Sequence, residues 1–468
     1  MPKRTTTWSR KVPVKAGCGI LATSLIVIAN LAVGAPVIWT NDGAPVQAQI
    51  TGGPWTLAQG PSSNAFPSKG YCINGARQGN PSTELMQPYY FPAVFGHGKH
   101  LQGFFDWRPK NINEAVVTAE SNDGGRTWTF QDEALDLRET CPPSDTTDNG
   151  GDDGYGHPYV LDVYGAQYLY TLDRAATGKV SSIDNLGLVV NNLTPVHGKP
   201  LNGVQAGVAV QDANGGYTSY TPLRTTGLLN PDGIIAAVPG RHPVTVLYLQ
   251  KIRSGDNTGA TTLPASQQCG PQPVTGRKAN HDIVIPRLAT TSDGVNFADL
   301  GPVTGLNDPT TVSNAGTRYM GPRGTVIRLD ENKYGLFFSG GNCLDADSDA
   351  FHYIGYAEST DLVNWTVVNG INNPIASIAS ITVPVDGVVT MIPAETPVVG
   401  PTQDWFKARI YSPSVNHFDD RRFTLTFAGY QVQSPAMDLA HYRQIGNVML
   451  KVSRRDLDDD DDHARGED

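Results

Sequence analysis

Residues 91–107 read FPAVFGHGKHLQGFFDW, in which a proline opens an apolar run and a turn joins it to an aromatic run. The same unit recurs at residues 157–173, 230–249, 321–338 and 412–430. Its prolines, 66 to 91 residues apart, are Pro92, Pro158, Pro231, Pro322 and Pro413. A hairpin repeated at this period, without helical periodicity between copies, indicates small sheets arranged radially. The sequence therefore predicts an all-β fold: a five-bladed β-propeller of four-stranded antiparallel blades over residues 87–455.

The composition agrees with one β-rich domain. The 468 residues include 50 Gly and 34 Pro, which mark turns and oppose helix interiors, and only 17% are charged. The formal net charge of −10 disfavours nucleic acid and anionic membranes as partners. We expect a monomer.

The N-terminus has the pattern of an export signal. Five Lys and Arg residues precede the apolar run 16–35, and Val46-Gln47-Ala48 offers small residues for a signal peptidase. We interpret residues 1–48 as a signal peptide, with cleavage after Ala35 or an uncleaved anchor as alternatives. The protein is then secreted or periplasmic, with no stable membrane insertion after cleavage.

Two flanking segments complete the predicted domain organisation. Residues 49–86 are an irregular lead-in that wraps the outside or supplies the strand that closes the ring. Residues 456–468 are an acidic tail, predicted to be disordered.

Cysteine usage agrees with export. Outside the signal, an even number of cysteines remains: Cys72, Cys141, Cys269 and Cys343. They allow two disulfides, in three possible pairings. A zinc site is the alternative, although no CxxC spacing is present.

A polar turn follows the third strand of three of the units. In SNDGGRTW, residues 121–128, Asp123 can accept hydrogen bonds from its own turn, two glycines supply positive φ, and Trp128 anchors the turn in the core. Residues 291–297 and 359–365 place an Asp and an aromatic residue at nearly the same spacing. These turns are predicted to stabilise the fold.

The turns resemble the Asp-box of sialidases and related propellers. The resemblance extends through the first unit, in YYFPAV, LQGFFDWR and EAVVTAESNDGGRTW, and is looser with other propeller glycoside hydrolases. It implies a propeller fold and a function directed at glycans. Tyr90 stands where sialidases carry a carboxylate-binding Arg, so the resemblance bears on the fold more than on the activity.

Residues beside the five prolines are predicted to line a central cavity, because a propeller collects one loop from each blade around its axis. Glycoside hydrolysis needs two carboxyl groups flanking the scissile bond. Asp232 is the candidate base or nucleophile, and Glu395 the candidate acid. Asp153, with Asp152 beside it, is a third candidate that would orient a sugar or tune a pKa. The alternatives are a plain turn for Asp232 and solvated loops for the acids.

Four further residues are candidates for substrate binding. Arg323 would bind hydroxyls or a carboxylate, and Tyr159 and Trp107 would stack on a sugar face. His157 lies in the same predicted ring, with a structural histidine as its alternative.

Two acidic loops suggest calcium. Asp345, Asp347 and Asp349 alternate along the chain, as hard oxygen ligands do, and residues 145–153 form a second acidic loop. We therefore expect a structural calcium ion and no cofactor for catalysis; a hydrated surface loop is the alternative.

These observations predict a secreted glycoside hydrolase that acts through paired carboxylates, with carbohydrate as its partner. The rival is a non-catalytic propeller that binds a glycan or another envelope component. A third reading is a metal-dependent enzyme that uses His157 and nearby acids as ligands.

Overall fold

The computed structural model describes most of the strands and the turns that join them. The described residues are 36–52, 72–73, 76–77, 89–107, 115–135, 154–176, 183–192, 210–211, 217–219, 223–252, 283–306, 319–341, 351–370, 373–378, 382–385, 388–391, 397–399, 403–407, 409–430 and 443–452. Within them, no helix is long and apolar enough to cross a membrane.

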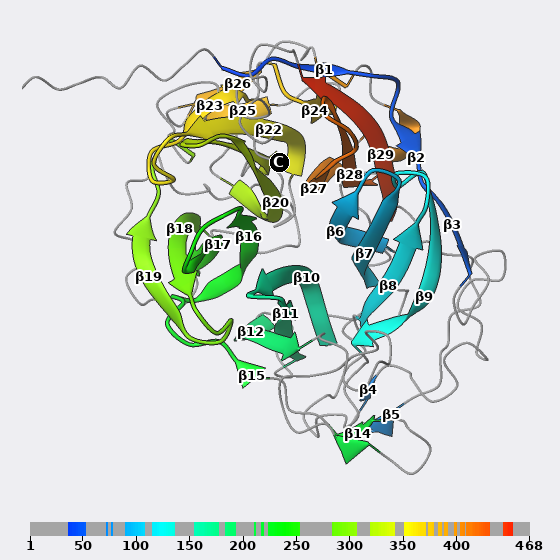
Figure 1. The fold of residues 1–468 in the computed structure, drawn as a ribbon, viewed down its shortest axis with the longest axis vertical. Coiled ribbons are helices and arrows are strands. Elements are labelled where there is room, and N and C mark those ends of the chain that lie inside the picture. The colour runs from blue at the N-terminus through cyan, green and yellow to red at the C-terminus, as the bar shows by residue number, and fades with distance from the viewer. Residues whose placement is uncertain are drawn as a thin grey trace, which may run out of the picture. The chain divides into compact units, whose positions relative to one another are not determined.

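Five sheets of four or five strands carry the fold (Figure 1). The first contains β6 (Tyr89–His97), β7 (His100–Trp107), β8 (Ala115–Ser121), β9 (Thr127–Leu135) and β3 (Gln49–Gly52). The second contains β10 (Gly154–Val163), β11 (Ala166–Ala176), β12 (Ile183–Asn192) and β15 (Leu223–Arg224). The third contains β16 (Pro231–Val238), β17 (Val244–Ile252), β18 (Ile283–Thr291) and β19 (Phe297–Pro302).

The fourth and fifth sheets follow the same plan. The fourth contains β20 (Tyr319–Asp330), β21 (Lys333–Gly341), β22 (Phe351–Ser359), β23 (Thr366–Asn369) and β24 (Ala376–Ser377). The fifth contains β27 (Arg409–His417), β28 (Arg422–Tyr430), β29 (Arg443–Val452), β1 (Trp39–Asn41) and β2 (Val46–Gln47). Smaller elements are β4 (Cys72–Ile73) with β5 (Ala76–Arg77), β13 (Val210–Gln211) with β14 (Tyr217–Ser219), β25 (Thr382–Val385) with β26 (Val388–Met391), and the 3-10 turn η5 (Asp404–Phe406).

The first strands of the five sheets form a ring. They contact one another in the order β6, β10, β16, β20, β27 and back to β6. Figure 1 shows these strands nearest the common centre and the last strands of the sheets at the periphery. The predicted all-β propeller is therefore confirmed, and every described strand pair of the five sheets except β3–β9 is antiparallel. Each of the five proline-led hairpins is confirmed as well.

Two details of the prediction were wrong. Three of the five sheets have five strands instead of four. One added strand, β3, pairs with β9 in parallel, so the sheets are not purely antiparallel. In this sheet β3 covers β9, whose outer edge would otherwise be unpaired.

The boundary that we predicted at residue 48 also does not fit the structure. Strands β1 and β2 pair antiparallel with β29, the last strand of the chain's fifth sheet. Burial alternates over this segment: Val37 and Trp39 are 2% and 4% exposed, whereas Ile38 between them is 63% exposed. Residues 36–48 thus belong to the propeller, and cleavage after Ala48 would remove two of its strands. Cleavage itself stays a prediction.

Trp39 fixes this segment to two sheets. Its ring packs edge-on against Phe337 and Tyr356 of the fourth sheet, at centroid distances of 4.9 and 5.5 Å, and against Phe423 of the fifth sheet at 5.2 Å. The Val37 N–H donates to Glu358 Oε1 at 2.7 Å. The segment therefore bridges the two sheets in addition to extending one of them.

Substitution of Trp39 tests this closure. We expect Trp39→Ala to lower the free energy of unfolding by about 3–5 kcal/mol, because a large buried ring is lost from a packed cluster. Ile38→Ala is the matched control, since its side chain is exposed, and should cost less than about 0.5 kcal/mol. Chemical denaturation of both variants measures the difference. Equal effects would show that β1 does not close the ring.

The three polar turns have the predicted structure. Asp123 Oδ1 accepts from the N–H groups of Arg126 and Thr127 at 3.0 and 2.9 Å, and Trp128 is fully buried. Asp293 and Asp361 each accept from the N–H groups two and three residues further along, at 2.7 to 2.9 Å. Each turn lies between the third and fourth strands of its sheet, so it orients the outer strand.

These hydrogen bonds change the acidity of the carboxyl groups. The side-chain and backbone hydrogen bonds from Asn296 lower the pKa of Asp293 to about 2. Burial alone would raise the pKa of Asp123 and Asp361, but the hydrogen bonds of their turns outweigh it and lower both. A lowered pKa means that the carboxylate stabilises the folded state above its unfolded pKa of about 3.9. That contribution is lost as the pH falls through the folded pKa.

An acid titration of stability tests this account. We expect the midpoint of thermal unfolding to fall between about pH 4 and pH 2, and Asp293→Asn to flatten part of that fall while lowering stability at pH 7. The control is Asp420→Asn, which removes an exposed carboxylate from the β27–β28 turn. A wild-type slope retained in Asp293→Asn would mean that Asp293 does not contribute to acid sensitivity.

Candidate functional site

Each of the five prolines lies at a bulge in the first strand of its sheet. In the first sheet, the register of pairing with the second strand shifts between Tyr90 and Ala93, on either side of Pro92. The corresponding shifts in the other four sheets lie between Gly156 and Tyr159, Pro231 and Gly233, Met320 and Gly324, and Tyr411 and Ser414. Proline has no N–H to donate and a fixed φ, so it is tolerated at bulges and poorly in a regular ladder. Bulges also redirect side chains, and they recur beside active sites.

The bulges release several predicted site residues from the ladder. Asp232 is skipped at the proline bulge of β16, and Arg323 is skipped at that of β20. Asn230, Arg323 and Ser412 adopt positive φ values of 39°, 92° and 56°. Such conformations cost about 1–3 kcal/mol each for residues other than glycine, and they concentrate at functional sites.

Side-chain hydroxyls join neighbouring first strands. Ser414 Oγ accepts from the Val94 N–H at 2.9 Å and donates to the Val94 carbonyl at 3.0 Å. Thr325 Oγ1 accepts from the Val415 N–H at 2.9 Å and donates to the Pro413 carbonyl at 3.3 Å. Each first strand is a sheet edge, so its outward backbone groups need other partners. Ser414, which we expected to line the cavity, instead joins β27 to β6.

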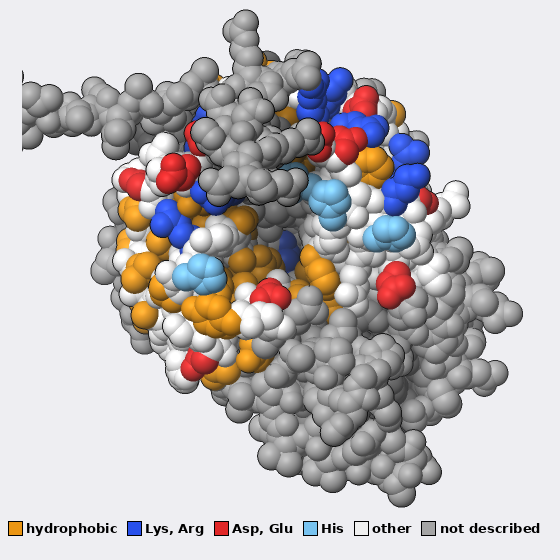
Figure 2. Space-filling view, in the orientation of Figure 1, with side chains coloured by type: hydrophobic (Ala, Val, Ile, Leu, Met, Phe, Trp, Pro, Cys, Tyr) orange, Lys and Arg blue, Asp and Glu red, His pale blue; other side chains and the backbone are white. Residues whose placement is uncertain are grey.

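Arg323 and Tyr159 meet on the inner side of the ring. Arg323 Nη1 donates to the Ile234 carbonyl at 2.7 Å, and its Cζ lies 5.7 Å from the centre of the Tyr159 ring. Because β10 and β20 are not neighbours in the ring, this contact passes β16 on the axial side. The Ala237 N–H donates to the Tyr159 hydroxyl at 2.5 Å. Three strands therefore converge here. Figure 2, in the orientation of Figure 1, shows a hollow over the centre of the ring of sheets.

The electrostatics of this junction keep Tyr159 neutral. Burial raises the pKa of Tyr159 to about 12, although the hydrogen bond from Ala237 and the nearby Arg323 charge oppose the rise. Arg323 is 1% exposed. Asp232 on β16 is 6% exposed. The junction thus combines a carboxylate-bearing strand, a buried guanidinium and a phenol.

The structure describes three of the predicted site residues and brings two of them, Arg323 and Tyr159, into contact. Asp232, Tyr159 and Arg323 lie on the converging strands β16, β10 and β20. His157 lies at the bulge of β10 and Trp107 at the end of β7, but their side chains are outside the described part of the chain. Outside the described residues altogether are Glu395, Asp152, Asp153, Asp345, Asp347 and Asp349. The acidic loop 145–153 also lies outside them.

The described residues do not test the proposed metal or disulfides. Among them, no group of three or more His, Cys, Asp or Glu side chains gathers closely enough to hold a metal ion. Cys72 lies in β4, whereas Cys141, Cys269 and Cys343 fall outside the described ranges. Calcium and disulfides stay predictions.

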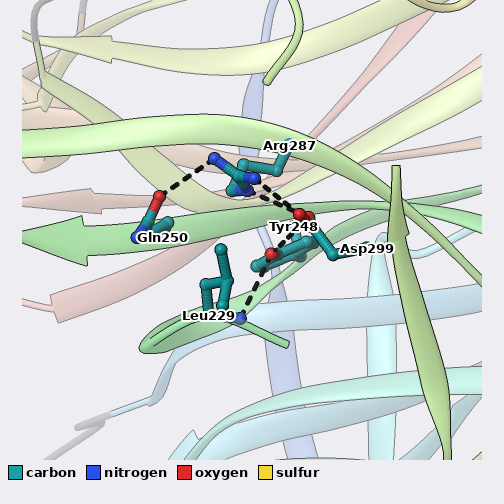
Figure 3. A network of polar contacts seen from close by, with 5 residues as sticks. All are labelled: Leu229, Tyr248, Gln250, Arg287 and Asp299. Atoms are coloured by element: carbon teal, nitrogen blue, oxygen red, sulfur yellow. Dashed lines mark hydrogen bonds and ion pairs between the residues drawn. The ribbon is translucent and has the colours of Figure 1, made fainter. Parts of the chain in front are cut away.

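A polar network supports the start of β16 (Figure 3). Arg287 on β18 donates to both carboxylate oxygens of Asp299 on β19, from Nε at 2.9 Å and Nη2 at 2.5 Å. The Tyr248 hydroxyl on β17 donates to Asp299 at 2.8 Å and accepts from the Leu229 N–H at 3.2 Å. Leu229 directly precedes Asn230 and the Pro231 bulge. The network therefore connects Asp299 on β19 with Leu229, which lies three residues before Asp232.

The hydrogen bonds of this network change the pKa values of its members. The hydrogen bond from Arg287 lowers the pKa of Asp299, and the same bond raises the pKa of Arg287. Burial raises the pKa of Tyr248 to about 12, so its hydroxyl keeps its proton. The network could not be predicted from the sequence, because its members are far apart in the chain.

A repeated segment that precedes two of the sheets was also not predicted. Thr226 forms a parallel β-bridge with Asn296 in the turn between β18 and β19, and Thr304 forms one with Asn364 in the turn between β22 and β23. Each threonine is followed by Gly and Leu. A Cβ on Gly227 or Gly305 would lie 1.8 Å from the carbonyl oxygen of Phe297 or Trp365. The repeated Thr-Gly-Leu at residues 226–228 and 304–306 was the signal in the sequence.

Comparisons with known proteins were made at the level of sequence and of structure. No family model matches the chain, and no curated protein sequence does. Among solved structures, the catalytic domain of a Coprinopsis cinerea family-62 α-L-arabinofuranosidase is similar at 12% identity and a TM-score of 0.43, over 82% of this chain and 96% of that one. A Podospora anserina α-L-arabinofuranosidase complexed with cellotriose gives 10% identity and 0.44, over 82% and 96%.

A third similar structure is a thermostable family-43 glycoside hydrolase, at 15% identity and a TM-score of 0.39, over 79% of this chain and 94% of that one. The structural neighbours of the chain thus include glycoside hydrolases. All three TM-scores lie below 0.5, so these similarities do not establish an activity for the chain.

Substitution of Tyr248 tests the support of β16. Tyr248→Phe removes one hydroxyl that both donates and accepts, so we expect a loss of about 1–2 kcal/mol in the free energy of unfolding. A double-mutant cycle with Asp299→Asn, measured by chemical denaturation, should show coupling above about 0.5 kcal/mol. Additive effects would mean that the two side chains stabilise the sheet independently.

Proposed function

We propose that this protein binds a glycan in its central hollow and hydrolyses a glycosidic bond there. The observation that carries the proposal is the contact of Arg323 with Tyr159 beside β16, the strand that bears Asp232. Bulges release both Asp232 and Arg323 from the ladder. Carbohydrate sites combine a carboxylate with hydrogen-bond donors and an aromatic face. The junction supplies all three types.

In this proposal Asp232 is the base or the nucleophile. Hydrolysis requires a second carboxyl group about 5 to 9.5 Å away, and Glu395 and Asp153 stay the candidates for it. Arg323 would bind substrate oxygens, and the neutral Tyr159 hydroxyl would donate a hydrogen bond. Trp107 and His157 stay candidates for the walls of the same site.

The proposal takes each of the five sheets as one blade. The cyclic contacts of the five first strands support this count, because every sheet contributes one strand to the ring. It also retains the sialidase-like Asp-box as a description of the three polar turns, supported by their Asp-centred hydrogen bonds. Export, either with cleavage after Ala35 or with an anchor, belongs to the same proposal.

A non-catalytic glycan-binding propeller is the second candidate. It is favoured by one observation: of the ten residues that flank the five prolines, only Asp232 is a carboxylate. If neither Glu395 nor Asp153 approaches Asp232, the hollow can bind a sugar without cleaving it.

Activity measurements separate the two candidates. We expect the purified protein to release reducing sugar from at least one member of a polysaccharide and aryl-glycoside panel. Asp232→Asn should lower kcat by about 10²–10⁴-fold. Asp330→Asn is the control, because it changes an exposed carboxylate at the far end of another first strand. Glycan binding without turnover would favour the binding module, and full activity in Asp232→Asn would exclude the assigned role.

A further inference from the structure

Two turns from neighbouring sheets expose an aromatic pair on the surface. Tyr164, in the turn between β10 and β11, is 56% exposed. Its ring stacks on that of His242, in the turn between β16 and β17, with a centroid distance of 5.6 Å and an interplanar angle of 15°. Among the large hydrophobic side chains that are exposed in the described ranges, Tyr164 is the one aromatic.

Local interactions hold both turns in place. Asp162 Oδ1 accepts from the Gly165 N–H at 2.7 Å, and Tyr164 and Gly165 have φ values of 54° and 87°, as a tight two-residue turn requires. On the other side, the Arg241 guanidinium lies over the Tyr334 ring at 5.3 Å. The aromatic pair is therefore preorganised, which lowers the entropic cost of binding a ligand.

A surface depression with a volume of about 330 Å³ is lined by Pro243, the residue that follows His242 in the chain. Its other lining residues are Thr290, Thr291, Ser292, Asp293, Asn296, Phe297 and Ala298. Figure 2 shows hydrophobic side chains interspersed with polar ones over this part of the face, above β16 to β18. The depression thus offers hydroxyl, carboxylate and amide groups, and Pro243 links it along the chain to the stacked aromatic pair.

We propose that this surface binds a neutral oligosaccharide, at a site separate from the central hollow. A sugar ring presents a C–H face that packs on an aromatic ring, while its hydroxyls pair with side chains such as those of Ser292 and Thr290. Acidic glycans are disfavoured because the Asp293 carboxylate lines the depression and the whole chain is negatively charged. The inference does not depend on hydrolysis in the central hollow.

Affinity electrophoresis in gels that contain single polysaccharides tests the site. We expect the wild-type protein to be retarded by at least one neutral polysaccharide and to move freely in polygalacturonate. Tyr164→Asn should weaken that retardation about fivefold to tenfold. Asn suits this test because it tolerates the positive φ of the position better than Ala does. Tyr164→Phe, which keeps the stacking face, should remain within about twofold of wild type.

Two controls make the result decisive. Leu300→Ala removes an exposed apolar side chain from β19 and should leave the retardation unchanged. Asp420→Asn changes an exposed carboxylate in the β27–β28 turn, outside both proposed sites, and should also leave it unchanged. Retardation lost in Asp232→Asn but kept in Tyr164→Asn would overturn the proposal, as would the absence of retardation by every neutral polysaccharide. Circular dichroism of each variant shows that the fold is intact.

Discussion

The structure depends on the pairing of its N-terminal strands, β1 and β2, with its last strand, β29. A ring of sheets is stable only when its final edge is covered, because an open edge leaves a row of unpaired backbone groups. Here β1 and β2 cover β29, and Trp39 packs at the same time against the sheet before it. Glu358 adds a polar link, since it accepts from the Val37 N–H and pairs with Lys333 at 3.1 Å. The closure holds the fourth and fifth sheets together, and thereby fixes β20 and β27 around the axis.

A second constraint arises where the first strands face that axis. These strands are sheet edges on the inner side, so their backbone groups cannot all be paired within their own sheets. Prolines remove some of the donors, and the hydroxyls of Ser414 and Thr325 serve others. The bulges that accommodate the prolines also turn Asp232 and Arg323 out of the ladder. The feature that allows the ring to close therefore also presents the candidate site, at the cost of strain at Arg323.

Much of this architecture was readable from the sequence. The five proline-led hairpins and the three polar turns rely on local chemistry, a missing N–H or an Asp beside its own backbone, and they fold where the pattern places them. The closing strand was misassigned because Val37 and Trp39 follow an apolar leader, which hid the alternation of buried and exposed side chains. The Arg287–Asp299–Tyr248 network and the Arg323–Tyr159 contact join distant segments, so no local pattern could have shown them.

The two ends of the first strands are under different physical demands. At the proline end, packing around the axis and backbone pairing are enough to explain each residue by its contribution to folding. A functional test is therefore needed to separate the structural role of Asp232 and Arg323 from a role in binding or catalysis. At the hairpin end, a turn requires only suitable φ values and an Asx acceptor, which Asp162 and Gly165 supply. A large aromatic ring that is 56% exposed at Tyr164 contributes little to that turn, and a polar residue that tolerates positive φ would serve it as well. The exposed ring is thus better explained by contact with a ligand than by stability of the fold.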